Sequence, residues 1–119
     1  MILTQQKKNA LIELGDIETM SRADLNWLIT IPTDGSLPCD GIAPSLIQWL
    51  NMAHPATKLA DSGCSLVSIE GFHPKAETIN ATLQSIGFKG FFSVTQIGET
   101  EQPSLLAYIQ TPGGICKIE

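Results

Sequence analysis

The second half of the chain has a pattern that few folds can accommodate, which is one strand, one helix and then three strands. Residues 64–69 (C-S-L-V-S-I) alternate apolar and polar side chains, as a half-buried strand does. Pro74 then suits the first position of a helix, and Gly87 suits the position just after its end. Between them, apolar residues recur at helical spacing and make one stripe: Ala76, Ile79, Leu83 and Ile86.

Three more apolar runs follow the predicted helix, at residues 91–97, 104–110 and 115–118. The polar segment 98–103 separates the first two runs, and the turn sequence T-P-G-G at 111–114 separates the last two. Each run is short and bounded by turn residues, which predicts three strands. The second half is therefore predicted to be a βαβββ module over residues 64–119.

The first half of the chain contains three apolar runs and no helical pattern. The runs lie at residues 9–17, 25–31 and 45–50, and we expect each to be a strand. We expect residues 1–8, which are mostly polar, to be a frayed N-terminus. The chain is thus predicted to be a single α+β domain over residues 9–119, of order βββ followed by βαβββ. Its parts are a partial first module (9–50), a connector (51–63) and a second module (64–119).

Short motifs are spread along residues 9–119. They are P-S-L-I-Q-W, H-P-A, D-S-G, H-P at the start of the predicted helix, and T-P-G-G before the last strand. Together they resemble the glyoxalase-like domain of the vicinal oxygen chelate (glyoxalase/bleomycin resistance/dioxygenase) superfamily. The most specific piece is Ile47-Gln48-Trp49 followed by His54-Pro55. The resemblance implies a curved mixed sheet around a cleft, and activities that range from isomerisation and oxygen-dependent ring cleavage to antibiotic binding without chemistry.

The resemblance also implies two βαβββ modules, and this chain lacks the first β-α of module one. Seven predicted strands in place of eight leave an edge of the sheet unpaired. Exposed edges favour pairing with another chain. We therefore expect an oligomer, most simply a homodimer with two-fold symmetry.

The residues that bind metal in that superfamily are not found at the matching positions of this chain. The family's usual ligands are a His or Gln on the first strand of a module and a Glu on its last strand. Residues 65–68 contain neither His nor Gln, and Ile118 stands where the Glu is expected. Glu119 is one residue further on, so its side chain would point to the opposite face. We expect no cofactor, and a divalent metal held by Glu13, His54 or a partner chain is the less favoured alternative.

Six residues are candidate contacts to a ligand, and each also has a structural interpretation. Two tryptophans on neighbouring strands predict an apolar pocket wall, or else simple core packing. A glutamine or histidine beside them would anchor polar groups, although a lone histidine more often bonds nearby backbone. Glu13 on a strand predicts a general base, and Tyr108 on a strand predicts a hydroxyl group in the cleft. The structural alternative for both is a side chain exposed to solvent. The six residues are Trp27, Gln48, Trp49, His54, Tyr108 and Glu13. His73 is expected to be a capping or surface residue.

Composition and charge exclude several classes of function. Twelve acidic against seven basic side chains give a net charge of -5, which disfavours nucleic acid and anionic membrane surfaces as partners. No apolar run approaches the roughly 20 residues of a membrane span. We see no secretion signal at the N-terminus and expect a cytoplasmic protein. The three cysteines lack C-x-x-C spacing and are expected to be reduced thiols: Cys39, Cys64 and Cys116.

Three hypotheses of function follow from the sequence. The first is a small-molecule-binding module without a complete metal site that acts as an oligomer. The second is a divalent-metal-dependent lyase or isomerase whose ligands are completed by a partner chain. The third is a non-catalytic assembly module.

Overall fold

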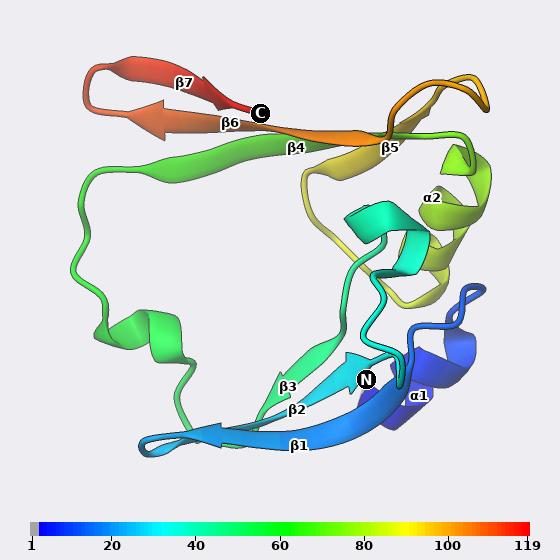
Figure 1. Cartoon of the computed structure of the whole chain (residues 1–119). Coiled ribbons are helices and arrows are strands. Elements are labelled where there is room, and N and C mark those ends of the chain that lie inside the picture. Colours follow the sequence, from blue (N-terminus) through cyan, green and yellow to red (C-terminus); the bar gives the residue numbers. More distant parts are fainter. Residues whose placement is uncertain (1–2) are drawn as a thin grey trace.

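The computed structural model describes residues 3–119, and its fold class is α+β, as predicted (Figure 1). Seven strands are present, six of them where the sequence places them, with one helix before the first strand and one within the second half. In chain order the elements are α1 (Leu3–Asn9), β1 (Asp16–Arg22), β2 (Leu25–Ile31), η1 (Pro38–Gly41), β3 (Ile47–Trp49), η2 (Pro55–Lys58), β4 (Ser65–His73), α2 (Ala76–Ser85), β5 (Phe92–Gln96), β6 (Ser104–Thr111) and β7 (Gly114–Ile118), where η marks a short 3-10 helix.

The second half forms the βαβββ module that the sequence predicts. Its sheet has the order β5-β4-β6-β7, in which β4 and β5 are parallel and the other neighbours are antiparallel. Parallel neighbours need a crossover, and α2 supplies it. The helix stops where expected, because Gly87 takes a φ of +80° and Phe88 N–H bonds the carbonyl of Leu83 at 2.9 Å.

The first half forms a separate antiparallel sheet of order β1-β2-β3. The predicted strand at residues 25–31 is confirmed, and it pairs with β1 along seven residues. The strand predicted at 45–50 is shorter and pairs with β2 at three positions, one of which joins Trp27 to Trp49.

The predicted N-terminal structure is wrong for residues 3–17. Residues 3–9 are a helix rather than a frayed end, and β1 begins only at Asp16 instead of at residue 9. The helix carries few apolar residues, so tertiary contacts stabilise it. Leu3 is only 2% exposed, its N–H donates to Gln48 Oε1 at 3.1 Å, and Lys7 pairs with Asp16 at 3.7 Å. The expectation for residues 1–2 lies outside the described residues.

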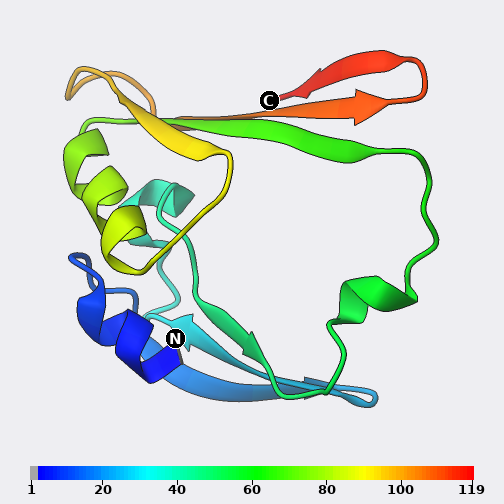
Figure 2. The same cartoon turned by 180° about the vertical axis from the view of Figure 1, so that it is seen from behind.

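The two sheets are not joined into one. Within residues 3–119 no strand of one sheet pairs with a strand of the other. The sheets face each other across the molecule, joined on one side by the helices and the loop 32–46, and on the other by residues 50–64 (Figures 1 and 2). Because α1 precedes β1, the first half is α-βββ and differs from βαβββ by a leading strand rather than by a strand and a helix.

The hydrophobic core lies on the side where the helices meet. One cluster joins α1 and the loops to the end of α2, and the other joins α2 to β5 and the loop before β3. The buried members are Leu3, Leu14, Ala43, Leu46 and Ile86 in the first cluster and Ile42, Ala76, Ile79, Leu83 and Val94 in the second. In the described part of the chain, neither helix has the length and apolar character that crossing a bilayer requires.

Candidate ligand-binding cavity

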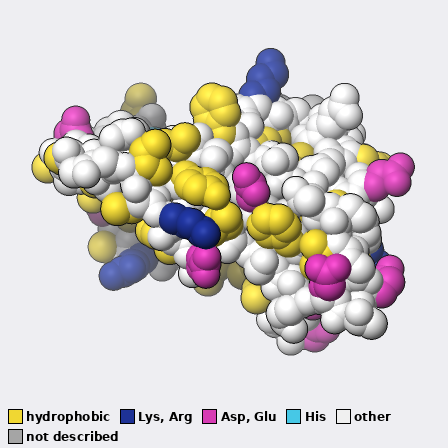
Figure 3. All heavy atoms as spheres, turned by 90° about the horizontal axis from the view of Figure 1, so that it is seen from above, with side chains coloured by type: hydrophobic (Ala, Val, Ile, Leu, Met, Phe, Trp, Pro, Cys, Tyr) yellow, Lys and Arg dark blue, Asp and Glu magenta, His cyan; other side chains and the backbone are white. Residues whose placement is uncertain are grey.

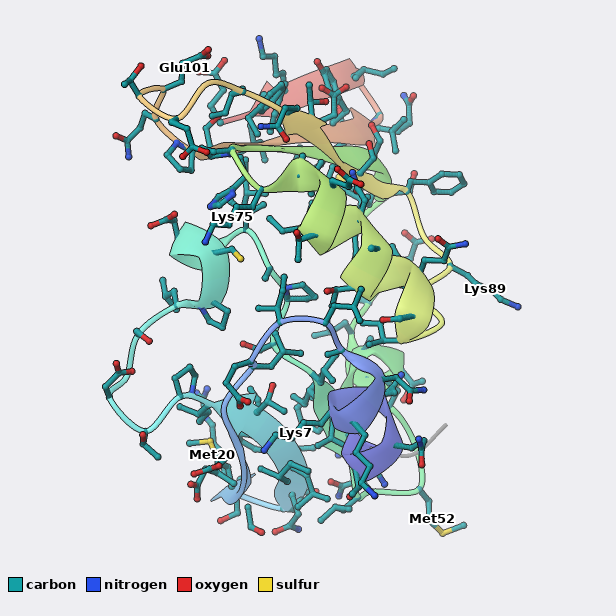
Figure 4. All side chains as sticks on the ribbon, turned by 90° about the vertical axis from the view of Figure 1, so that its right-hand side faces the viewer. Lys7, Met20, Met52, Lys75, Lys89 and Glu101 are labelled. Carbon is teal, nitrogen blue, oxygen red and sulfur yellow. The ribbon has the colours of Figure 1, made fainter. Side chains whose placement is uncertain are left out.

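An apolar cavity of about 720 Å³ lies between the loop before β3, the strands β4 and β6, and the segment that leads into β5. Its lining side chains are apolar apart from Ser45 and Lys89, and Lys89 extends away from the protein (Figure 4). The lining residues are Leu37, Pro38, Gly41, Ile42, Ala43, Pro44, Ser45, Leu66, Ile69, Phe88, Lys89, Gly90, Phe91, Phe92 and Leu105. We refer to this space as the larger cavity.

A close approach between a loop and a strand forms the inner end of the larger cavity. Ile42 is only 4% exposed, and it packs against Gly71 of β4. A Cβ atom at Gly71 would lie 2.9 Å from Ile42 Cγ2 and 3.3 Å from Val94 Cγ2. The absence of a side chain at Gly71 therefore allows the loop to seat against the sheet.

The opposite side of the larger cavity is open to water. Five large side chains of its lining are more than 40% exposed, and two of them are aromatic. The five are Leu37, Leu66, Phe88, Phe91 and Leu105. A ligand bound to one isolated chain would thus remain partly solvated.

A second, polar cavity of about 450 Å³ lies on the other side of η1, and it contains a buried histidine. His73 is 4% exposed, and its Nδ1 accepts a hydrogen bond from Lys75 N–H at 2.9 Å. Since Nδ1 is an acceptor, Nε2 carries the proton and donates it to Asp40 Oδ2 at 2.9 Å. His73 bonds the start of the helix, as a capping residue would, but it is buried and not a surface residue.

The backbone of η1, where Asp40 bonds His73, has an unusual conformation. Cys39 and Asp40 have φ values of +50° and +58°, in the left-handed region that non-glycine residues seldom adopt. Partial burial raises the pKa of the Cys39 thiol; nearby Asp40 acts in the same direction and Lys75 against it. Cys39 therefore stays a protonated thiol at neutral pH and is a poor nucleophile.

The structure brings three of the six predicted site residues together. The rings of Trp27 and Trp49 lie 5.1 Å apart between centroids, and the His54 ring lies 5.9 Å from Trp49, edge to face. His54 also has a structural role, because its Nδ1 accepts from Ala56 N–H at 3.0 Å and so caps η2. Met20 pairs with Trp27 across the strands, and Figure 4 shows it on the side of the sheet away from α1.

The other three predicted residues lie elsewhere. Gln48 points toward α1, where it accepts from Leu3 N–H, so it lies on the opposite face from Trp49. Glu13 lies in a loop and not in a strand, and its carboxylate accepts from Gly15 N–H at 2.9 Å. Tyr108 lies on β6 with odd spacing from Leu105, so it faces away from the larger cavity. None of the six predicted residues lines that cavity.

Sequence reasoning missed the residues that form the larger cavity. The one local signal was F-K-G-F-F at residues 88–92, an aromatic run that a single buried strand does not need. Among residues 3–119, no three His, Cys, Asp or Glu side chains are grouped as a metal site requires.

The comparisons with known proteins agree with the fold. The family model described as "Glyoxalase-like domain" matches residues 3–87, which run from α1 through α2. No curated protein and no solved structure matches the chain. The resemblance noted in the sequence is confirmed by this match, and the chain belongs to the glyoxalase-like domain family.

Proposed function

We propose that the protein binds a small, largely apolar molecule in the larger cavity, and does so without a metal ion. The observation that carries the proposal is the cavity itself, because its volume of about 720 Å³ lies within the range of small-molecule sites. Leu66, Ile69, Phe92 and Leu105 offer apolar contacts, and Ser45 offers a hydroxyl. A molecule with one or two polar groups at its rim fits this lining.

The lining favours binding over catalysis. Lys89 is its one ionisable side chain, and it extends into solvent (Figure 4). General acid–base chemistry needs a titratable group within hydrogen-bond reach of the reacting atom. Asp40 and His73 lie in the polar cavity, where His73 bonds both Asp40 and the start of α2.

Dye binding tests the proposal with a variant that fills the cavity. The probe is 1-anilinonaphthalene-8-sulfonate, whose fluorescence rises in apolar sites. Ser45→Phe places a ring in the cavity lining and is expected to weaken dye binding at least fivefold. The matched control is Ser62→Phe, an exposed position of the connector outside the lining, and it should leave binding unchanged. Equal binding by the wild type and both variants would place the dye elsewhere and contradict the proposal.

The metal-dependent lyase or isomerase is the second candidate, and the residues expected to hold its metal do not fit. Glu13 and His54 each accept a backbone N–H through one side-chain atom, and the described chain groups neither with two further ligands. A partner chain would have to complete the site. Elemental analysis decides between the candidates, because stoichiometric zinc, nickel, manganese or iron in the purified protein would favour the enzyme.

We further propose that the protein acts as a homodimer in the cytoplasm. Both sheets end in unpaired edges, at β1 and β3 in the first and at β5 and β7 in the second. Such edges favour association. The free thiols Cys39, Cys64 and Cys116 suit a reducing compartment. The remaining alternative, an assembly module without a ligand, predicts the dimer but no dye binding.

A further inference from the structure

One face of the four-stranded sheet is apolar over the middle of β4, β6 and β7, while His73, Gln96 and Thr111 lie at its ends. Leu66, Ile69 and Leu105 line the larger cavity and therefore mark this face. The strand register then places their cross-strand neighbours on the same side: Ile69 is opposite Ala107 and Leu66 is opposite Ile109 on β6, and these two are opposite Ile118 and Cys116 on β7. We call these seven residues the bare face: Leu66, Ile69, Leu105, Ala107, Ile109, Cys116 and Ile118.

The two faces of this sheet differ in chemistry. The bare face has no charged or amide side chain, whereas Glu70, Gln110 and Lys117 lie on the other face by alternation. Figure 3 looks onto that other face, where hydrophobic side chains lie among Lys, Asp and Glu. Antiparallel sheets commonly solvate one face and bury the other, so the bare face has the composition of the buried one.

The bare face is nevertheless exposed in the single chain. The loop before β3 covers only its inner end, at Gly71. Further out, Leu66 is 53% exposed, Leu105 is 42% exposed and Ile118 is 54% exposed. Monomeric proteins seldom leave a contiguous apolar surface of this kind in water.

The chain exposes more surface than a compact monomer of its mass. Its accessible surface is 8041 Å², whereas a compact monomer of 12.8 kDa exposes about 6,300 Å². Its radius of gyration is 15.8 Å, against about 13.5 Å for a compact domain of this length. The surplus of roughly 1,700 Å² exceeds the ~800 Å² that each partner buries in a standard interface, and it suits an obligate homodimer.

We propose that a second copy of the chain covers the bare face and thereby closes the open side of the larger cavity. Leu66, Ile69 and Leu105 belong both to the bare face and to the lining of the larger cavity. A partner that covers the bare face therefore also encloses the cavity. Each ligand site is then complete only in the dimer. This last step rests on the proposed function, whereas the assembly itself does not.

Two isoleucines of one strand allow a matched test of the surface. Ile118 and Ile115 both lie on β7 and are 54% and 62% exposed, but the register places Ile118 on the bare face and Ile115 on the opposite face. The experiment is size-exclusion chromatography with light scattering at 50 µM. The wild type and Ile115→Glu are expected to have the mass of two chains, and Ile118→Glu the mass of one.

Any other combination of masses for the three proteins overturns the inference. A monomeric wild type with a radius of gyration near 13.5 Å by X-ray scattering would mean that the first sheet of the same chain closes over the bare face. A monomeric wild type that stays extended would mean that no second copy binds. Dimers in all three proteins, or loss of the dimer in both variants, would place the interface elsewhere.

A native thiol gives a readout that needs no variant. Cys116 lies on the bare face, while Cys64 precedes β4, and both are exposed in the single chain. A thiol-reactive reagent such as 5,5′-dithiobis(2-nitrobenzoate) should modify Cys64 at least tenfold faster than Cys116 at 50 µM protein. The difference should shrink on dilution to nanomolar concentration. Equal rates at high concentration would overturn the proposed surface even where Ile118→Glu does not fold.

Dye binding separates this inference from the proposed function. If the cavity binds the dye only in the dimer, Ile118→Glu loses both the doubled mass and the fluorescence. A wild-type dimer that binds no dye would contradict the ligand site and leave the interface standing. A wild-type monomer that binds the dye would contradict the interface and leave the ligand site standing.

Discussion

Asp40 takes a backbone conformation that favours glycine, and one side-chain contact connects it to the rest of the molecule. Its carboxylate accepts from His73 Nε2, across 33 positions of sequence, and His73 is almost fully buried. The Asp40 side chain is itself 69% exposed, so solvent screening weakens the ionic part of the contact. The larger effect of losing the carboxylate is a buried ring N–H without an acceptor.

Asp40→Ala is expected to lower the free energy of unfolding by about 1–2 kcal/mol for that reason. Asp40→Asn keeps an oxygen that can accept from Nε2 and tolerates a positive φ, so its loss should be less than half as large. Urea unfolding measures the free energy of unfolding of both variants and of the wild type. Equal losses in the two variants would show that the hydrogen bond does not stabilise this loop.

At the scale of elements, the sequence predicted what local chemistry controls. Pro74 and Gly87 bracket α2, and the run at 25–31 became β2 with the predicted limits. The helix α1 was missed because L-T-Q-Q-K-K-N carries one buried apolar residue, Leu3, and the contact that holds its first turn comes from Gln48, 45 residues away. Asp40 and His73 were not paired for the same reason, since no local pattern joins a loop to the end of a distant strand.

The candidate site was predictable only in part. The sequence placed Trp27 and Trp49 on neighbouring strands, and their rings are in contact. It could not show that the larger cavity forms elsewhere, because that cavity depends on how the loop with Ile42 seats against Gly71. No residue near Gly71 in the sequence indicates that the loop with Ile42 approaches it. The approach is seen only in the three-dimensional contacts.

The seating of this loop on β4 gives a prediction about elements. Gly71→Ala introduces a methyl group 2.9 Å from Ile42 Cγ2 and should lower the free energy of unfolding by about 1–3 kcal/mol through overpacking. Leucine lacks that branched methyl, so Ile42→Leu combined with Gly71→Ala should recover more than half of the loss. Chemical unfolding of the two single variants and the double variant measures the coupling. Additive losses would mean that the loop does not touch Gly71 in solution.

At the scale of the whole molecule, an apolar face without a cover couples folding to association. The described chain buries ten hydrophobic side chains almost completely, and fourteen large hydrophobic ones are exposed. A domain with so small a core is marginal by itself, because conformational entropy opposes the ordering of every residue, whether or not that residue is buried. Covering the bare face with a second copy would then contribute a large part of the stability of the folded state.

Such a protein must become more stable as its concentration rises, because dissociation accompanies unfolding. With an unfolding enthalpy of about 0.7 kcal/mol per residue in both chains, each tenfold increase in concentration should raise Tm by roughly 3 °C. Differential scanning calorimetry from 5 to 500 µM measures this shift. Ile115→Glu should keep it, and Ile118→Glu should unfold at a lower temperature that no longer depends on concentration. A wild-type Tm that is constant over this range would mean that the chain completes its core alone.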